Sequence, residues 1–301
     1  MAASTRRTYQ TGTAFTRFCH NHGIPLLPAS ELTLRYFCTH FSKTVTYQTI
    51  KVYLAAIRLL HLEQGFRNPT RDTPLLTYLC IGIRHSGRRT NMTRLPFTIP
   101  LLRVIKQQLS TSTLPAQAKL LYWAAFTLAF YGFLRASEYS CPTQSKFTKT
   151  RHLLLRDISA TTNSLSVHLK RSESDRFGKS ATVLVGATGS STCPVRAMHK
   201  FLTARQAQPS GPLFTFTSGK FLTRSDISRT TKRLLRAAGI DPVRYSSHSY
   251  RIGAATAAAD AGLPDHLIKT LGRWRSSAYQ TYIHTSPDML RKVARLITQA
   301  Q

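Results

Sequence analysis

Two side chains near the C-terminal end of the sequence have the spacing of a phosphate-binding pair. His248 and Arg251 lie three residues apart in SSHSYRIGAATAAADAG, where Ser246 or Ser247 is expected to cap a helix that runs to Gly262. Residues three apart share one face of a helix, and the first turn of a helix attracts anions. The pair therefore predicts an anion site, although a capped helix with an ordinary surface histidine and arginine gives the same pattern.

Three other short segments contain side chains that could act on a bound phosphate. Arg135 is expected at the end of an apolar helix in GFLRASE, which would aim its guanidinium into the domain, and Trp274, in LGRW, carries an indole N–H donor. Ser276 or Ser277 is expected to cap a helix that carries Tyr279 and Tyr282. Taken singly, the arginine could balance a helix dipole and the aromatic rings could belong to the core. Together they allow phosphate chemistry with a tyrosine nucleophile.

In this order the segments resemble the conserved boxes of the tyrosine recombinase (phage integrase) family. GFLRASE is similar to the first arginine box, HSYR with GAATAAADAG to the HxxR box, LGRW to the His/Trp box, and the final Tyr-Ile to the nucleophile. The stretch LGRWRSSAYQTYI is most similar to recombinases of eukaryotic DIRS-type retrotransposons and Crypton-type elements. In those the tyrosine lies eight residues after the tryptophan, which favours Tyr282 over Tyr279 here.

The resemblance implies a role for each of these residues. Arg135 and Arg251 would hold the non-bridging oxygens of a DNA phosphate, where negative charge builds up during attack. His248 would handle the proton of the nucleophile, and Trp274 would donate a further hydrogen bond. Tyr282 would attack the phosphorus and form a 3′-phosphotyrosyl link with a free 5′-hydroxyl. Because that link keeps the energy of the phosphodiester, no cofactor and no metal are expected.

Two acidic residues stand out against the family pattern. Glu138 matches the acidic residue after the first arginine, which would orient neighbouring side chains. The family also has a lysine in a β-hairpin turn, where it protonates the leaving 5′-oxygen, but the matching position in KRSESDRFGK is Glu173. Lys170 or Lys179 could serve instead, and Arg171 could hold the phosphate without donating a proton. A damaged acid step and a turn with no role are the other interpretations.

The charge of the chain indicates a polyanionic partner. Lys and Arg number 42 against 12 Asp and Glu, which gives a net charge of +30 and a pI near 10.9. Both parts of the chain are basic, with +9 over residues 1–90 and +21 over residues 91–301. Binding to phosphates releases condensed counterions, so double-stranded DNA is the expected partner. A structural protein of the ribosomal type is the alternative.

Cysteine usage and hydropathy predict an intracellular protein. The five cysteines form no CxxC or zinc-type spacing and are expected to be reduced thiols. The N-terminus has no apolar signal region, and the longest apolar stretch, residues 120–134, is shorter than the ~20 residues that span a bilayer. No membrane association is expected. The resemblance to eukaryotic elements implies the nucleus.

The periodicity of the sequence predicts a mostly α-helical protein with a small antiparallel β-sheet, in two domains. Amphipathic helices in residues 1–90 indicate a bundle that also resembles the family's DNA-clamping core-binding domain. Residues 91–301 would form the catalytic domain, with strands at 152–158, 164–169 and 181–185 and the last two paired as a hairpin.

The predicted linker, about residues 86–100, is basic, polar and punctuated by proline. Its arginines are expected to bind DNA by following a phosphate backbone: Arg88, Arg89 and Arg94. At the other end of the chain, residues 286–300 are predicted to form a helix with one apolar stripe. In the family such a helix often docks into a neighbouring subunit, which implies a homo-tetramer on two DNA sites; folding back onto its own domain is the alternative.

The sequence therefore predicts a site-specific DNA recombinase or integrase of a mobile element. Two alternatives stay open. One is a DNA-binding protein of the same fold that has lost catalysis through Glu173. The other is a DNA-relaxing enzyme of the topoisomerase IB type, which would use the same chemistry but would need no second duplex.

Overall fold

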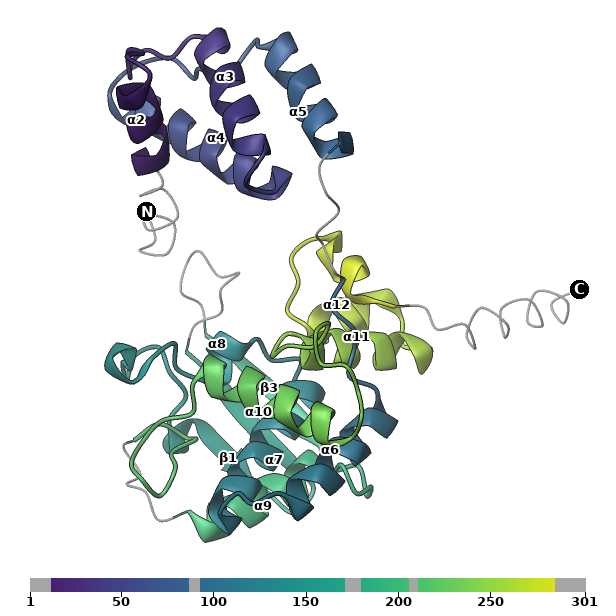
Figure 1. The fold of residues 1–301 in the computed structure, drawn as a ribbon. Helices are drawn as coiled ribbons and strands as arrows, with labels where there is room; N and C mark the ends of the chain where they lie inside the picture. The colour runs from purple at the N-terminus through teal and green to yellow at the C-terminus, as the bar shows by residue number, and fades with distance from the viewer. Residues whose placement is uncertain (1–11, 87–92, 171–179, 206–210, 285–301) are drawn as a thin grey trace, which may run out of the picture. The chain divides into compact units, whose positions relative to one another are not determined.

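The computed structural model describes residues 12–86, 93–170, 180–205 and 211–284. The chain divides into two compact units, Met1–Met92 and Thr93–Gln301, and each is described by itself (Figure 1). The described residues are mostly helical with one three-stranded antiparallel sheet, which confirms the predicted fold class. Within these ranges, no helix has the length and apolar character needed to cross a bilayer.

The described helices of the first unit are α2 (Gly12–Asn21), α3 (Glu31–Ser42), α4 (Tyr47–Glu63) and α5 (Pro74–Ser86). Ser30 and Thr46 cap α3 and α4, because each side-chain oxygen accepts the backbone N–H three residues further on. The apolar faces meet in a core rich in aromatic rings, where Phe37 packs edge-on against Phe15 and Phe18 with 5.3 Å between ring centroids.

Polar contacts of two side chains, His61 and Glu31, join separate segments of this unit. The fully buried ring of His61 accepts the N–H of Ala29 through Nε2 at 2.8 Å and donates through Nδ1 to the carbonyl of Ile57 at 2.7 Å. Glu31, on α3, accepts the N–H of Leu76 on α5 at 2.8 Å. Each contact satisfies a backbone N–H that would otherwise be costly to bury.

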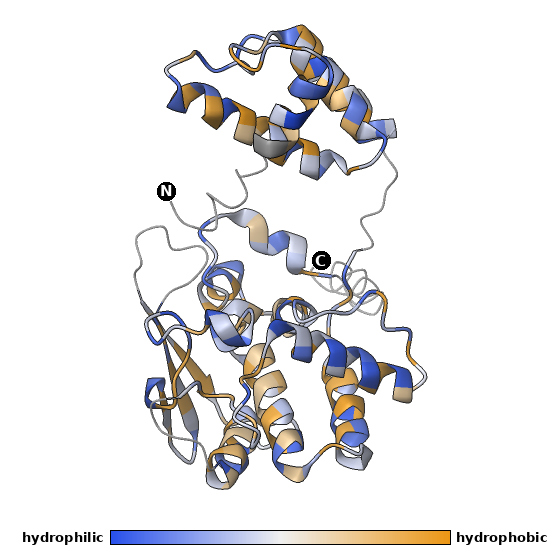
Figure 2. Ribbon diagram, turned by 60° about the vertical axis from the view of Figure 1, so that its left-hand side comes forward, coloured by the Kyte–Doolittle hydropathy of each residue, from blue (hydrophilic) through white to orange (hydrophobic). Residues whose placement is uncertain are grey.

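The second unit is built around α7 (Ala116–Tyr131), in which every residue from 121 to 130 is buried. Around it are α6 (Ile99–Thr111), α8 (Ala136–Tyr139), α9 (Pro194–Ala204) and α10 (Arg224–Ala237). A helix that is apolar all round belongs in the core. Figure 2 shows the contrast between such strongly hydrophobic helices and outer helices that carry hydrophilic stretches.

The sheet consists of β1 (Ile158–Ala160), β2 (Ser164–Leu169) and β3 (Ala181–Gly186) in the order β1-β2-β3. The predicted hairpin is confirmed: β2 and β3 pair antiparallel, with Val167 opposite Val183. Alternation buries Leu165, Val167 and Leu169 on one face. The turn between these strands, residues 171–179, lies outside the described residues.

The strand predicted at residues 152–158 is wrong for most of its length. Leu155–Asp157 form a 3₁₀ turn, η2, and pairing with β2 begins only at Ile158. The cause is Asp157, whose carboxylate accepts the N–H of Leu154 at 2.8 Å and closes the turn. A local side-chain hydrogen bond has overridden the β propensity of the leucine run.

A separate apolar cluster holds the last described elements together. These are α11 (Ser249–Asp260), α12 (Asp265–Leu271) and the 3₁₀ helix η3 (Ser277–Tyr282), which Ser276 caps as expected. The cluster contains Phe133, Ala254, Ala255, Ala258, Ile268, Trp274 and Tyr279. Small alanines on α11 let large aromatic rings pack close to the helix, which is how the end of the described chain is attached.

Two predicted helix ends need correction. No serine caps α11: the residue before it is His248, which makes no side-chain cap, and the hydroxyl of Ser246 instead accepts the His248 N–H at 3.3 Å. Arg135 does not end an apolar helix either. Helix α7 stops at Tyr131, and Arg135 is the N-terminal cap position of the short helix α8.

Close packing at Gly253 joins α11 to the start of the second unit. The N–H of Phe97 donates to the carbonyl of Ser249 at 3.0 Å, and the Phe97 ring stacks on Tyr250 with centroids 4.3 Å apart. A Cβ atom at Gly253 would lie 2.0 Å from the carbonyl oxygen of Phe97. Glycine is therefore required here by backbone contact, because the neighbouring atom cannot rotate away.

We expect Gly253→Ala to destabilise the second unit by about 1–3 kcal/mol, since the added methyl must push the backbone of Phe97 away from α11. Urea unfolding of the full chain, followed by tryptophan fluorescence, measures the change because both tryptophans, Trp123 and Trp274, belong to this unit. Gly186→Ala is the matched control, because no atom lies within 4 Å of its added Cβ. Equal stability of the two variants would contradict the packing argument.

Candidate active site

Four of the residues singled out in the sequence come together at one place. The ring of Tyr282 lies 5.0 Å from that of His248 and 5.4 Å from that of Trp274, between ring centroids. The guanidinium carbon of Arg251 lies 4.3 Å above the Trp274 ring, a cation–π contact. These side chains come from the start of α11, the turn after α12 and the end of η3, so three separate elements form the cluster.

Arg135 joins this cluster through the buried carboxylate of Glu138. The side chain of Glu138 is 1% exposed, and its Oε1 lies 3.2 Å from Nη1 of Arg135. The backbone N–H of Arg135 donates to Oε2 at 2.8 Å, so Glu138 holds both the main chain and the side chain of this arginine. The orienting contact that the family resemblance implies for Glu138 is thus present in the geometry.

Arg251 is the largest fully buried side chain of the structure's described part. Its Nη1 donates to the carbonyl of Phe133 and its Nη2 to the carbonyl of Gly272, while Nε has no acceptor among the described residues. Burial first, and then the nearby positive charge of Arg135, lowers its pKa to about 9. Arg251 therefore remains a cation at neutral pH, with N–H groups left to offer an anion.

His248 is surrounded by positive charge. Burial first, and then the positive charges of Arg251, Arg135, Arg224 and Arg94 in that order of strength, together lower its pKa to about 4. At neutral pH the imidazole is uncharged and has one nitrogen free of a proton. A neutral imidazole beside a phenol can accept the phenolic proton, which is what a base for a tyrosine nucleophile must do.

The two candidate tyrosines differ in their surroundings. Tyr279 is buried, and its hydroxyl donates to Asp265 at 2.7 Å, an arrangement that serves packing within the apolar cluster. Tyr282 is half-buried with its ring against His248, and its carbonyl accepts the hydroxyl of Thr256 at 3.2 Å. Geometry therefore favours Tyr282, as the spacing after Trp274 also does.

Trp274 is positioned by the glycine two residues before it. A Cβ atom on Gly272 would lie 1.6 Å from Cζ3 of the indole, so the ring occupies the space that a side chain at residue 272 would need. Arg251 lies against the indole ring, and the Phe133 ring stands nearly perpendicular to it with 6.3 Å between centroids. The indole thus fills the space between the guanidinium and the two tyrosines.

Lys170, one of the candidate acids, has a different set of partners. Its ammonium lies 2.6 Å from the Asp157 carboxylate and donates to the carbonyls of Lys149 at 2.9 Å and His152 at 3.2 Å. An ammonium has three N–H groups, and these three acceptors use all of them. Lys170 therefore holds the η2 turn to β2. Lys179, the other candidate, lies outside the described residues, as do Arg171 and Glu173.

Of the arginines predicted to bind DNA, Arg94 is described and Arg88 and Arg89 are not. Arg94 is exposed, donates to the carbonyl of Val243 at 3.1 Å, and is close enough to lower the pKa of His248. Arg224, at the start of α10, acts on His248 in the same way and was not singled out from the sequence. Both add positive charge at the rim of the cluster.

Arg273 is a second residue that sequence reasoning missed. Its Nη2 lies 2.8 Å from Oε2 of Glu138, and its side chain is 14% exposed. It lies in the LGRW segment, beside Trp274. Its role depends on the contact with Glu138, which is 135 residues away in the sequence, and no sequence pattern reveals a contact over that separation.

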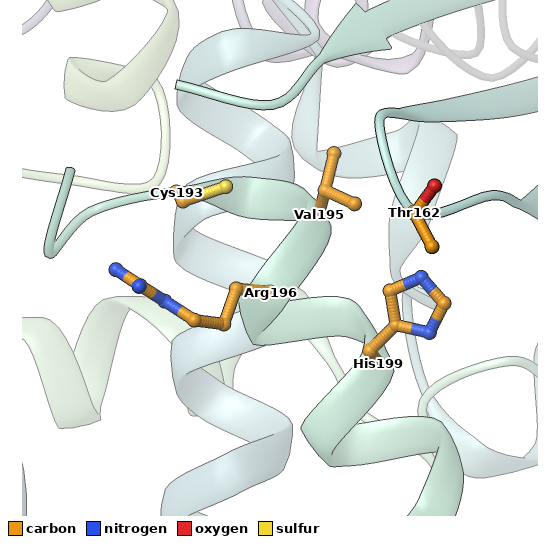
Figure 3. A pocket seen from close by; sticks show the side chains of 5 residues that line it. All are labelled: Thr162, Cys193, Val195, Arg196 and His199. Atoms are coloured by element: carbon orange, nitrogen blue, oxygen red, sulfur yellow. The ribbon is translucent and has the colours of Figure 1, made fainter. Parts of the chain in front are cut away.

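Other chemistry finds little support in the described residues. They contain no group of three or more His, Cys, Asp or Glu side chains that could hold a metal ion. A surface pocket is lined by Thr162, Cys193, Val195, Arg196 and His199, none of which belongs to the cluster. Figure 3 shows the Arg196 side chain pointing away from His199 and Thr162, so these groups do not converge on one ligand. The cluster around Arg251 is the candidate site.

Comparison with known proteins identifies the family of the chain. Residues 102–289 match the phage integrase family. A protein of Selenomonas ruminantium described as an integrase/recombinase xerD homolog is 26% identical over 257 residues, which cover 81% of this chain and 70% of that protein. Two solved structures are similar in fold. One is the XerH site-specific recombinase bound to palindromic difH substrate in a post-cleavage complex, with a TM-score of 0.67 and 14% identity, covering 96% of this chain and 78% of that one. The other is the Tn1549 transposon integrase in complex with transposon right end DNA, with a TM-score of 0.66 and 13% identity, covering 99% of this chain and 95% of that one.

His248 should stay uncharged far into the acid range. We expect its imidazole resonances, assigned with His248→Gln, to titrate near pH 4 instead of near the ordinary ~6.5. Because the unfolded chain binds this proton at higher pH than the folded chain, the free energy of unfolding should fall as the pH drops from about 6.5 towards 4. His248→Gln should lose that part of the pH dependence. A midpoint near 6.5 in the folded protein would contradict the burial and charge argument.

Proposed function

Since the chain belongs to the phage integrase family, we propose that it is a site-specific DNA recombinase that cleaves and rejoins DNA through Tyr282. The observation that carries this proposal is the cluster in which the Tyr282 ring meets a neutral His248 and lies against Trp274, next to the buried guanidinium of Arg251. Arg135, held by Glu138, supplies a second guanidinium.

The chemistry of the cut follows from these groups. The phenol oxygen of Tyr282 attacks the phosphorus, its proton passes to the imidazole of His248, and the bond to the 5′-oxygen breaks. Arg135 and Arg251 stabilise the charge on the non-bridging oxygens, to which the Trp274 indole adds a hydrogen bond. The products are a 3′-phosphotyrosyl link and a free 5′-hydroxyl, and the reverse attack rejoins the strand. Neither ATP nor a metal is needed to conserve the bond energy.

The leaving 5′-oxygen needs a proton, and the donor is the weakest part of this mechanism. Lys170 gives its three N–H groups to Asp157, Lys149 and His152, so it is a poor donor. Lys179 is then the remaining lysine of the predicted turn, and the position where the family has its lysine holds Glu173. The second candidate function rests on this observation: a DNA-binding protein of the same fold whose cleavage is slow.

The substrate we propose is double-stranded DNA. A net charge of +30 supports it, and the related XerH and Tn1549 structures are DNA complexes. Residues 1–90 would clamp the duplex against the catalytic part, residues 91–301, with Arg88, Arg89 and Arg94 of the linker on the phosphate backbone. Arg171 would add a phosphate contact from the hairpin turn.

The biological setting we propose is integration of a mobile element in the nucleus. It rests on the segment LGRWRSSAYQTYI, which is most similar to the matching segment of DIRS-type and Crypton-type recombinases. Strand exchange would take place in a homo-tetramer on two DNA sites, joined by the helix predicted at residues 286–300. A topoisomerase IB-like relaxing enzyme would need no second duplex, so joining of two labelled duplexes separates the two functions.

Covalent trapping tests the nucleophile. Nicked suicide duplexes, selected by the protein from a random-sequence library, should yield a denaturation-resistant protein–DNA adduct that Tyr282→Phe abolishes. Tyr279→Phe is the matched control and should keep the adduct, because that hydroxyl is occupied by Asp265. Loss of the adduct with Tyr279→Phe alone would overturn the assignment. No adduct from any duplex that the protein binds would favour the DNA-binding alternative.

Glu173→Lys tests the acid step. If the acid is missing, the variant should cleave on the order of 10²-fold faster on a suicide duplex, because general acids contribute about that much or more. A duplex with a 5′-phosphorothiolate at the cut needs no leaving-group proton, so on it the variant and the natural sequence should cleave at similar rates. Equal rates on the ordinary duplex as well would mean that another group, such as Lys179, already donates.

A further inference from the structure

We propose that Arg273 is a positioning residue that holds Glu138, and through it Arg135, in the orientation that phosphate binding requires. This inference rests on the proposed function, since it assigns Arg135 to the phosphate. The carboxylate of Glu138 has Arg135 on one side and Arg273 on the other, at 3.2 and 2.8 Å, and its side chain is 1% exposed. A carboxylate so thoroughly removed from water stays ionised only where cations and donors surround it.

The contacts of Arg273 join two turns that are far apart in the sequence. Its Nη1 donates to the carbonyl of Gly132 at 3.3 Å and to that of Leu271 at 3.1 Å. Its Nη2 donates to the carbonyl of Phe133 at 3.2 Å and to Glu138 at 2.8 Å. One guanidinium therefore fastens the turn that precedes Arg135 to the turn that carries Trp274.

Arg273 and Arg251 share an acceptor, which couples the two sides of the site. The carbonyl of Phe133 accepts both Nη2 of Arg273 and Nη1 of Arg251. Phe133 has a φ of +50° and Arg273 a φ of +55°, a left-handed conformation that residues with a side chain adopt only under constraint. The shared hydrogen bonds supply that constraint at both turns.

The same contacts commit most of the Arg273 guanidinium to the protein. A guanidinium has five N–H groups. The Nη atoms of Arg273 make four hydrogen bonds within the protein, and Nε is buried with no acceptor in the described part of the chain. All four Nη–H groups are therefore used within the protein, and these contacts support a positioning role. Burial lowers the pKa of Arg273, and the charge of Glu138 opposes that shift.

The test compares Arg273→Gln, Arg273→Lys and Glu138→Gln in the full chain. At saturating nicked suicide duplex, Arg273→Gln should slow single-turnover adduct formation at least tenfold while the Kd for that duplex changes less than twofold. Arg273→Lys should recover part of the rate, because an ammonium can still pair with Glu138 but cannot reach all three carbonyls. The double variant Arg273→Gln/Glu138→Gln should be no slower than the slower single variant, since each change breaks the same contact between Arg273 and Glu138.

Arg103→Gln is the matched control, because it removes an exposed arginine of α6 and should leave the rate at saturation unchanged. A wild-type rate for Arg273→Gln, or rate losses that multiply in the double variant, would overturn the proposal. The proposal would also fail if Arg273→Gln weakened the Kd for the duplex but left the rate at saturating duplex unchanged.

A second readout separates this inference from the proposed function. The side-chain Nε–H resonance of Arg135, assigned with Arg135→Lys, should be sharp in the natural sequence and in Arg103→Gln, and broadened or shifted in Arg273→Gln. This measurement needs no cleavage. If no variant forms an adduct but the Arg135 resonance responds to Arg273→Gln, the proposed function fails and the positioning role stands. An unchanged resonance would overturn the positioning role.

Discussion

One buried carboxylate, that of Glu138, organises the positive charge of the second unit. Glu138 pairs with Arg135 and Arg273, and Arg251 donates to the carbonyl of Phe133 that Arg273 also uses. The cluster keeps an excess of positive charge in a place from which water is largely excluded, where unpaired charge is unfavourable. A phosphate would relieve that excess. The arrangement therefore stores, in the protein without DNA, the electrostatic preference that a cleavage site must have.

The same charge sets the protonation states that a tyrosine nucleophile needs. His248 is kept neutral by burial and by its arginine neighbours, so it can accept a proton at the pH where the guanidiniums remain charged. Apolar packing then decides which phenol it meets. The ring of Tyr279 packs into the apolar cluster of α11 and α12 and keeps η3 beside them, while the Tyr282 ring lies against the imidazole. Electrostatics and packing thus act on the same short segment.

The proposed protonation of the leaving group depends on the β-hairpin, whose turn, residues 171–179, lies outside the described residues. The lysine at the base of the hairpin, Lys170, serves the fold by bridging Asp157 and two carbonyls, so the β-sheet and the acid step compete for one side chain. Glu173 stands where the family pattern has a lysine, so the proposed acid step depends on whether Lys179 can replace it. Cleavage and affinity must therefore be measured apart.

Elements with local signals could be predicted from the amino-acid sequence. The hairpin of β2 and β3 follows from two-residue alternation, and the start of η3 follows from its serine cap. The order of the motifs also gave the family. Other features become visible only in the folded chain: the turn at Asp157 that displaced a predicted strand, the partners that occupy Lys170, the contact of Tyr279 with Asp265, and the place of Arg273 beside Glu138. Each of these depends on a specific contact between one side chain and its partner, and a specific contact of this kind produces no periodic pattern that a single sequence would show.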